Sequence, residues 1–305
     1  MKIKAYFCRL TFVSMKKMAP SELMVNSDGS IFHLHIKPEQ LADTVILVGD
    51  PARVQQISQF FSSIECRQQS REFFSTTGVY KGCRMTILST GIGTDNIDIV
   101  VNELDALANI DLNARTVKPK HRSLRLVRIG TSGALQPDIP LGALLLSKIS
   151  IGFDGLLNWY ASRDSVSLLD YEEAFVRHMK WSDRWPAPYF VPNTPTLVDL
   201  FAPISTSGMT ISASGFYGPQ GRVLRLPLHD PNLLEKIESF RYLDNRICNF
   251  EMEGSAIAGL SALLGHQAVT ICLIIANRYK QQSNTSYASL MNSFIEKVLD
   301  KLSDV

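Results

Sequence analysis

The sequence predicts an α/β fold, a single domain of three layers (α/β/α) around a twisted mixed central sheet. Short β-branched apolar runs, typical of buried strands, alternate along the chain with segments of helical periodicity. Two of these runs pass through a glycine-containing turn directly into a helix. The 305 residues are 45% hydrophobic and 20% charged, which is enough apolar material for a sizeable core.

The first strand–turn–helix unit begins at Thr44 with the sequence TVILVGDPARV. Its strand ends at Gly49, which lets a ligand approach the backbone amide. Pro51 suits the first helical turn, and Arg53 follows one turn inside the helix. An anion site at this helix start is one interpretation, and an ordinary Gly-Asp-Pro turn is the other.

The second unit has a strand from Arg84 to Thr90 and a helix whose apolar stripe runs from Ile97 to Leu107. The turn between them reads G-x-G-x-x-N, which is not the dinucleotide fingerprint, and no acid follows at the end of a matching second strand. The sequence therefore predicts no nicotinamide cofactor.

An arginine interrupts the third strand, which covers residues 126–130. Arg128 is costly to bury in an apolar strand unless it pairs with a fixed anion. Together with Arg53 and the hydroxyl of Thr131 it would form a phosphate cradle at the strand ends, where open α/β sheets bind ligands.

A glycine-rich loop, GFYGPQGR, covers residues 215–222. Phe216 offers a stacking face, Gln220 an amide and Arg222 a guanidinium, a set that suits a planar heterocycle with carbonyl oxygens and an N–H. An ordinary turn with a surface arginine explains the composition equally well.

Two carboxylates stand at the start of a predicted helix in NFEMEGSAIAGLSALL, residues 249–264. Glu251 and Glu253 flank Met252, and acids are favoured at such positions by the helix dipole. However, small residues follow and a buried strand begins near Ala268, which places the acids at an interior junction. The pattern therefore leaves two interpretations open: a charged cap on a solvated helix start, or acids that serve a site in the interior.

Two segments are less regular. Residues 117–125 are basic and are expected to form a solvated connecting loop. Residues 155–195 contain three tryptophans and several prolines, and are expected to be a long insertion with a short helix near 171–179. Such loops are usually lids or oligomer contacts, and their aromatic residues are more often packing than ligand-binding.

Composition limits the kinds of binding partner that are expected. The formal net charge is +2, so neither nucleic acid nor membrane is expected as the main partner. The odd, scattered cysteines favour reduced thiols in the cytoplasm and no structural metal. They are Cys8, Cys66, Cys83, Cys248 and Cys272. Residues 1–30 fit a secretory signal poorly and are expected to be a weakly ordered extension.

His33 and His35 alternate in a predicted short extended segment, where both side chains face the same way. No acid or cysteine stands nearby, so a surface strand, or one histidine lent to a site built elsewhere, is favoured over a metal site.

Taken together, these motifs resemble those of the nucleoside phosphorylase superfamily, most closely the uridine phosphorylases. They occur in the family's order and close to its spacing between residues 31 and 300. The motifs are GDPARV, STGIGTDN, RIGTSGAL, FYGPQGR, FEMEGSA and IIANR. The resemblance implies a phosphorylase-like domain over residues 31–305, with 117–125 and 155–195 as insertions.

The resemblance also implies site residues. Phosphate is held by Gly49, Arg53, Arg71, Arg128 and Thr131, with Arg71 lent by a neighbouring subunit. Ribose is held by Met252, Glu253 and the partner's copy of His33, and Glu251 is expected to orient a partner arginine. The base is held by Gln220 and Arg222 beside Phe216, in a loop that departs from the family's FYPGQER by inverting Gly-Pro and by placing Gly221 where the family has an acid.

The reaction implied is phosphorolysis of uridine to uracil and ribose 1-phosphate, with inorganic phosphate as co-substrate and no cofactor or metal. Breaking the N-glycosidic bond develops positive charge on the ribose and negative charge on the base. Glu253, Arg128 and Arg222 are therefore the expected catalytic groups. Purine-specific relatives carry an aspartate near the end of the last strand, where this chain has Asn277 and Arg278.

Two alternatives remain open: a phosphorylase or hydrolase of another nucleoside or nucleotide, and a catalytically inactive nucleoside-binding protein. Three arginines at one site argue against a hydrolase, and an intact Glu253 argues against an inactive protein. The borrowed residues imply a homodimer as the site-forming unit, and the resemblance suggests a hexamer of dimers.

Overall fold

The computed structural model describes residues 17–304. Its α-helices are α1 (Pro51–Ser58), α2 (Thr94–Asn109), α3 (Leu169–Met179), α4 (Pro195–Phe201), α5 (Leu233–Ser239), α6 (Gly254–Leu264) and α7 (Ala288–Ser303). The main sheet contains β1 (Thr44–Val48), β2 (Ser63–Ser70), β3 (Phe73–Tyr80), β4 (Cys83–Ser89), β7 (Arg125–Ala134), β8 (Leu144–Gly152), β9 (Tyr189–Pro192), β10 (Thr206–Ser212), β11 (Arg241–Tyr242), β12 (Asn245–Glu251), β13 (Gln267–Asn277) and β14 (Gln282–Ser283). A separate hairpin joins β5 (Ile110–Asp111) to β6 (Thr116–Val117).

The predicted mixed sheet is confirmed. Its strands follow the order β11-β12-β10-β8-β13-β7-β1-β4-β3-β2. The central neighbours β13, β7, β1 and β4 run parallel, whereas β2, β3 and β4 form an antiparallel meander and β8 is antiparallel to β13. The strand ends that carry the glycine turns of the first and second units therefore meet at one edge of the sheet.

The sheet closes on itself at one end, which the sequence did not predict. The far end of β7 also pairs antiparallel with β12, joining Gly133 to Phe250 and Ala134 to Asn249. Strands β7, β13, β8, β10 and β12 thus form a closed ring. This ring brings the Glu251 end of β12 alongside the end of β7, close to Arg128.

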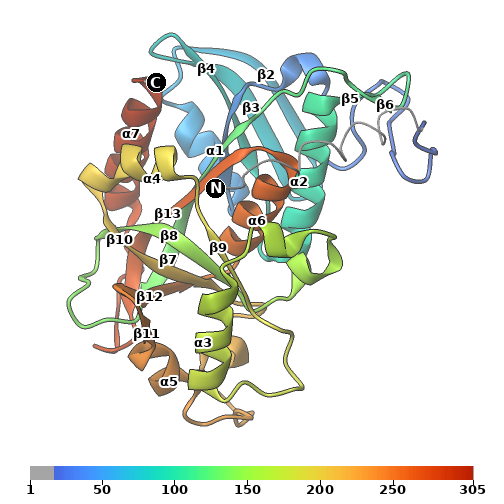
Figure 1. Cartoon of the computed structure of the whole chain (residues 1–305). Helices are drawn as coiled ribbons and strands as arrows, with labels where there is room; N and C mark the ends of the chain where they lie inside the picture. The colour runs from blue at the N-terminus through green and yellow to red at the C-terminus, as the bar shows by residue number, and fades with distance from the viewer. Residues whose placement is uncertain (1–16, 305) are drawn as a thin grey trace, which may run out of the picture.

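The three predicted layers are confirmed by the packing of β1. Val45 and Leu47 point into a core cluster built with α2 and α6, whereas Ile46 and Val48 point into a cluster built with α1, α4 and α7. This alternation follows from the two-residue period of a strand. Figure 1 shows α2 and α6 on one side of the sheet and α7 and α4 on the other. A third cluster packs α3 and α5 beside the closed ring.

Two predictions about the first part of the chain are wrong. Residues 17–30 are not a weakly ordered extension, because Leu23 is buried and Met18 N–H donates to Arg115 O at 2.9 Å; residues 1–16 lie outside the described part. The segment around His33 turns instead of running straight, and His35 has φ +52°. The turn buries Ile31, Leu34 and Ile36 together, which strict alternation would not allow.

The two irregular segments have defined structure. Residues 117–125 are mostly exposed, as predicted, but His121 Nε2 and Ser123 Oγ bond the carbonyls of Leu264 and Gly265 at 3.0 and 2.8 Å and so cap the end of α6. The predicted helix is present as α3, and β9 adds a strand beside β8. Between residues 17 and 304, no helix combines the length and apolar character needed to cross a membrane.

Candidate active site

One cavity of about 610 Å³ opens at the carboxyl ends of β1, β7 and β12 and at the start of α6. Every residue predicted for the site lines it, apart from Arg71 and His33. These lining residues are Gly49, Arg53, Phe216, Arg128, Thr131, Gln220, Arg222, Met252 and Glu253. The structure therefore brings together the three groups of residues that the motifs suggested separately.

The first helix start supplies one end of the cavity. Asp50 caps α1 by accepting the Ala52 N–H at 2.9 Å, so its carboxylate stabilises the helix. Arg53, one turn inside, is buried and donates to Ile129 O at 3.4 Å. Burial lowers the pKa of Arg53, and the nearby charge of Arg128 lowers it further.

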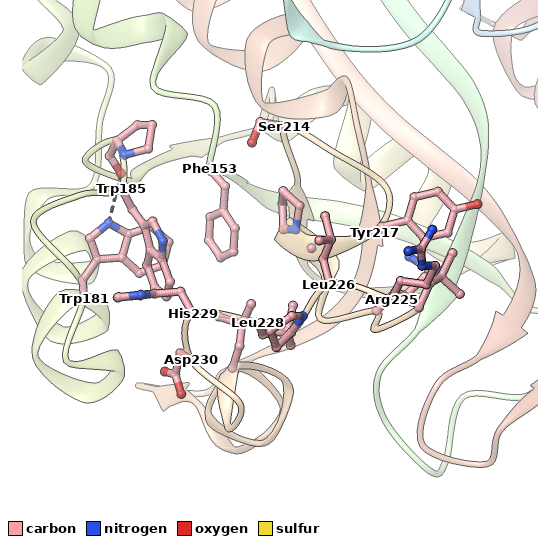
Figure 2. Close-up of a pocket in the computed structure, with 17 residues that line it drawn as sticks. Phe153, Trp181, Trp185, Ser214, Tyr217, Arg225, Leu226, Leu228, His229 and Asp230 are labelled. Atoms are coloured by element: carbon pink, nitrogen blue, oxygen red, sulfur yellow. Dashed lines mark hydrogen bonds between the residues drawn. The ribbon is translucent and has the colours of Figure 1, made fainter.

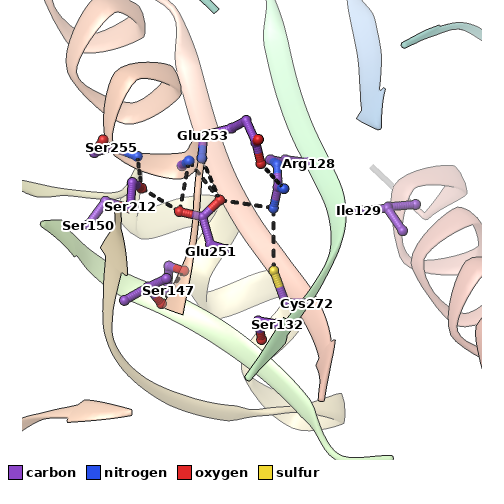
Figure 3. Close-up of polar contacts among 12 residues, drawn as sticks. Arg128, Ile129, Ser132, Ser147, Ser150, Ser212, Glu251, Glu253, Ser255 and Cys272 are labelled. Carbon is purple, nitrogen blue, oxygen red and sulfur yellow. Dashed lines mark hydrogen bonds and ion pairs between the residues drawn. The ribbon is translucent and has the colours of Figure 1, made fainter. Parts of the chain in front are cut away.

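Arg128 is paired with protein carboxylates. Its Nη1 lies 3.1 Å from Glu251 Oε2, and its Nη2 bonds Glu253 Oε2 (Figure 3). Burial alone would lower the pKa of Arg128, but the two carboxylates raise it overall, so the guanidinium stays charged. Gly130 makes room for this arrangement, because a Cβ there would lie 2.2 Å from Arg128 Nη1. The glycine of RIGT is thus a sequence signal for a folded-back arginine.

Glu251 organises the start of α6. Its carboxylate accepts the backbone N–H groups of Glu253 at 2.9 Å and Gly254 at 2.9–3.0 Å, and the hydroxyl of Ser212 donates to it (Figure 3). It also faces Arg128, in agreement with the expectation that it orients an arginine. Glu251 is therefore both the cap of the helix and the anchor of the guanidinium.

Glu253 is held from two sides. Its Oε2 meets Arg128, and its Oε1 accepts the Gly93 N–H at 2.7 Å. Burial raises the pKa of Glu253, and the cation of Arg128 opposes that shift. Gly93 has φ +102°, a conformation that favours glycine, so this turn of the second unit is shaped to reach the carboxylate. The sequence singled out the turn but not this contact.

The glycine-rich loop forms the opposite end of the cavity. The Arg222 guanidinium stacks 3.8 Å from the centre of the Phe216 ring, and its Nη1 donates to Gln220 Oε1. Burial and the charge of Arg278 lower the pKa of Arg222 to about 10, so it remains a cation at neutral pH. Gly221 has φ +70°, and Arg278 holds the loop by donating to Gln220 O at 3.0 Å.

The remaining two predicted residues lie outside this cavity. Arg71 is exposed in the turn between β2 and β3, and the neighbouring Glu72 side chain packs against Gly91 at the cavity edge. His33 lies beside α2, where its Nδ1 is 2.6 Å from Glu103 Oε1. Neither side chain lines the cavity of its own chain.

Some residues of the site were not predicted. Ser132 and Gly133 continue the β7 end, Ile275 and Ala276 come from β13, and Tyr287 precedes α7. Tyr287 gave no local signal, because only the packing of α7 brings it to this place. Asn277 does not line the cavity; its Nδ2 donates to Gln136 O and Ile139 O at 3.0 and 2.8 Å.

A second cavity, of about 690 Å³, shares Arg222 with the first. Its walls are mainly apolar and include Phe153, Trp181, Trp185 and Leu226 (Figure 2). The two tryptophan rings also pack edge to face on each other, with centroids 4.8 Å apart. The aromatic segment therefore contributes packing, as predicted, together with one wall of this cavity.

Asp105, His121 and His266 gather at the other end of α6, away from the cavity. His266 Nδ1 accepts the Leu124 N–H at 3.1 Å, so the proton of the neutral ring is on Nε2, 3.2 Å from Asp105 Oδ1. A protonated nitrogen cannot ligate a metal, and we assign no metal to this cluster.

The comparisons with known proteins agree with this geometry. The sequence profile of the Phosphorylase superfamily matches residues 43–304. Uridine phosphorylase of Thermococcus kodakarensis is 27% identical over 291 residues, which cover 93% of this chain and 92% of that protein. A purine nucleoside phosphorylase of the DeoD type from Streptococcus suis is 24% identical and covers 87% and 94%.

A solved structure is also similar. The Trypanosoma brucei nucleoside phosphorylase, described as showing uridine phosphorylase activity, is 29% identical, with a TM-score of 0.83 over 93% of this chain and 100% of that one. Because the profile spans most of the chain and the motifs meet in one cavity, this chain belongs to the phosphorylase superfamily.

Proposed function

We propose that this protein catalyses the phosphorolysis of uridine, with inorganic phosphate as co-substrate and no cofactor. The observation that carries the proposal is the arrangement of one cavity: two buried arginines at one end, Glu253 in the middle, and the Gln220 and Arg222 pair at the other. Relatives named uridine phosphorylase align along nearly the whole chain, which supports the same activity here.

Phosphate would bind at the end formed by Gly49, Arg53, Arg128 and Thr131. Arg128 Nε is buried and has no hydrogen-bond partner among residues 17–304. A buried donor of this kind is costly unless an acceptor reaches it, so the guanidinium keeps one N–H for an anion while Glu251 and Glu253 hold the other side.

The reaction is a displacement at the anomeric carbon. A phosphate oxygen forms the new C–O bond as the C–N bond breaks, and the electron pair of that bond leaves on the uracil nitrogen. Glu253 faces the ribose, where its negative charge stabilises the positive charge of the transition state. Arg222 and Gln220 stabilise the charge that develops on the uracil oxygens. Held phosphate and ribose also reduce the entropic part of the barrier.

Pyrimidine bases are favoured over purines by the β13 end of the cavity. Ile275 and Ala276 line it, and neither can protonate a purine ring. The adjacent Asn277 is committed to two backbone carbonyls. The match to a purine nucleoside phosphorylase makes this distinction the main alternative to test.

We further propose a homodimer as the site-forming unit and a hexamer of dimers in the cytoplasm. Arg71 is exposed on a turn next to the cavity edge, which suits a residue lent to a partner. His33 donates Nδ1–H to Glu103 and keeps Nε2 for a ribose hydroxyl of the partner's site. The cysteine thiols of the described chain, Cys66, Cys83, Cys248 and Cys272, are free, as in a reducing compartment.

The test is base release from a panel of uridine, thymidine, 2′-deoxyuridine, inosine and adenosine, each with and without phosphate. Phosphate-dependent release of uracil supports the proposal. Release without phosphate indicates a hydrolase, and preferential cleavage of inosine indicates a purine enzyme. Binding without release from any nucleoside would falsify enzymatic function and leave a nucleoside-binding protein.

A further inference from the structure

Three polar side chains outside the cavity meet behind the start of α6. Tyr189, the first residue of β9, places its hydroxyl 2.9 Å from Asp154 Oδ1 and 3.0 Å from Ser255 Oγ. Ser255 Oγ in turn donates to Asp154 Oδ2 at 3.0 Å. We call Asp154, Tyr189 and Ser255 the anchor triad. Asp154 lies two residues after β8, Tyr189 is in β9, and Ser255 is in the first turn of α6.

The position of the Tyr189 hydroxyl is imposed by packing. The side chain is fully buried, and its ring lies over Gly152, where a Cβ would be 2.1 Å from Tyr189 Cζ. Glycine at this position of β8 therefore leaves space for the ring. Because close packing fixes the ring, the Tyr189 hydroxyl has one position, and its contacts fix the side chains of Asp154 and Ser255.

A carboxylate such as that of Asp154 is an unusual residue type for a hydrogen bond that serves only the structure. No lysine or arginine in residues 17–304 lies within ion-pair distance of its carboxylate, although the side chain is largely withdrawn from water. It accepts three donors instead, the Tyr189 and Ser255 hydroxyls and the Leu156 N–H at 2.8 Å. Burial raises the pKa of Asp154. A carboxylate only accepts, so the single protons of the Tyr189 and Ser255 hydroxyls both point to Asp154, and the 3.0 Å approach of the two hydroxyl oxygens carries no proton of its own.

Ser212 connects the anchor triad to Glu251, which lines the cavity. The backbone N–H of Ser255 donates to Ser212 Oγ at 2.7 Å, and the Ser212 hydroxyl donates to Glu251 (Figure 3). Glu251 accepts the N–H groups of Glu253 and Gly254. The stretch 251–255 is thus fixed at both ends: the Glu251 carboxylate holds its first residues, and Asp154 holds Ser255 at the other end. Glu253 lies between these two anchors.

We propose that Asp154, Tyr189 and Ser255 are positioning residues that hold Glu253 against the ribose. This inference rests on the proposed function. Asp154 directly precedes the segment expected to be an insertion and Tyr189 lies within it, so that segment is tied to the sugar end of the site in addition to packing beside the base end. Displacing a reacting group by about 1 Å costs on the order of a hundredfold in rate.

The experiment compares Tyr189→Phe with Tyr80→Phe. Tyr80 is also buried and donates its hydroxyl to a carboxylate, Asp300, at 2.6 Å. However, it pairs with Cys83 at the start of β4, whereas the cavity lies just past the other end of β4, at Gly91. Each change removes one oxygen from one tyrosine–carboxylate bond. Initial rates are measured with uridine and 2′-deoxyuridine at varied phosphate, together with the melting temperature of each variant.

We expect Tyr189→Phe to lower kcat/KM for uridine by about tenfold or more, with the KM for phosphate within about twofold of wild type. The preference for uridine over 2′-deoxyuridine should fall by about fivefold, because a displaced Glu253 loses its bond to the 2′-hydroxyl. Ser255→Ala should do the same, and Tyr80→Phe should change only the melting temperature.

Equal losses on both nucleosides, or losses matched by Tyr80→Phe, would overturn the inference and leave the anchor triad with a structural role alone. Wild-type kinetics in Tyr189→Phe would overturn it as well. If Tyr189→Phe does not fold, Asp154→Asn supplies the same comparison, since it keeps the shape and removes the charge. A wild-type protein that releases no uracil refutes the proposed function itself, which separates the two failures.

Discussion

Replacing Arg128 with methionine is expected to impair both stability and turnover, and to make stability depend on pH. Arg128 is 5% exposed, and its guanidinium sits between Glu251 and Glu253. Methionine has a similar length without the charge. The variant therefore leaves two buried carboxylates facing each other, with no cation between them.

The magnitude follows from the contact with Glu251. Two unit charges 3.1 Å apart attract by about 5 kcal/mol at an effective dielectric constant of about 20. The cost of burying the charges offsets part of this attraction, and breaking such a buried pair costs about 3–5 kcal/mol. Turnover should fall at least about a hundredfold, because the same guanidinium is proposed to hold the phosphate.

The pH dependence has a defined sign. Burial already raises the pKa of Glu253 in the wild type, and loss of Arg128 raises it further. A carboxyl group whose pKa is higher in the folded state contributes stability at low pH that is lost as the pH rises through that folded pKa. The destabilisation of Arg128→Met should therefore be larger at pH 8 than at pH 5.

The assay is urea unfolding at both pH values, followed by tryptophan fluorescence, beside phosphate-dependent uracil release. Arg246→Met is the control, since Arg246 pairs with Asp138 at 2.9 Å on the surface and should cost no more than about 1 kcal/mol. A loss in Arg128→Met that is equally small and independent of pH, or uracil release near the wild-type rate, refutes the reasoning.

Three other substitutions test separate parts of the site. Glu253→Ala should lower turnover at least about a hundredfold in the uracil-release assay, and activity above a tenth of wild type would mean that the sugar end is misplaced. Arg222→Met should raise the KM for uridine at least about tenfold in initial-rate measurements; an equal rise in the KM for phosphate contradicts its place at the base end. Asn277→Asp should create no cleavage of inosine and should cost about 2 kcal/mol in urea unfolding, because a carboxylate would face two carbonyl oxygens; new inosine cleavage contradicts that orientation.

Much of the fold was readable from local patterns. The alternation of apolar runs and the glycine turns located β1, α1, β4 and α2, since strand period and turn chemistry depend on neighbouring residues. The same reasoning failed around His33, where a short extended segment with His33 and His35 on one face was predicted. There the chain turns, because Ile31, Leu34 and Ile36 all pack into one core cluster, and only the rest of the fold sets where that core lies.

The site residues were also partly predictable from local sequence and partly dependent on the tertiary structure. The sequence by itself singled out the candidate side chains Arg53, Arg128, Gln220, Arg222 and Glu253, because their residue types stand out against apolar or glycine-rich surroundings. It anticipated that Arg128 needs an anion, since an unpaired charge in a strand is too costly to bury.

Only the tertiary structure decided which anion that is. Glu253 is 125 residues further along the chain, and it reaches Arg128 because β12 pairs across the closed end of the sheet with β7. The anchor triad, the contact from Gly93 and the place of Tyr287 likewise depend on pairings between distant segments. Local propensity carries no information about such pairings, because they are selected by the burial and hydrogen bonding of the whole domain.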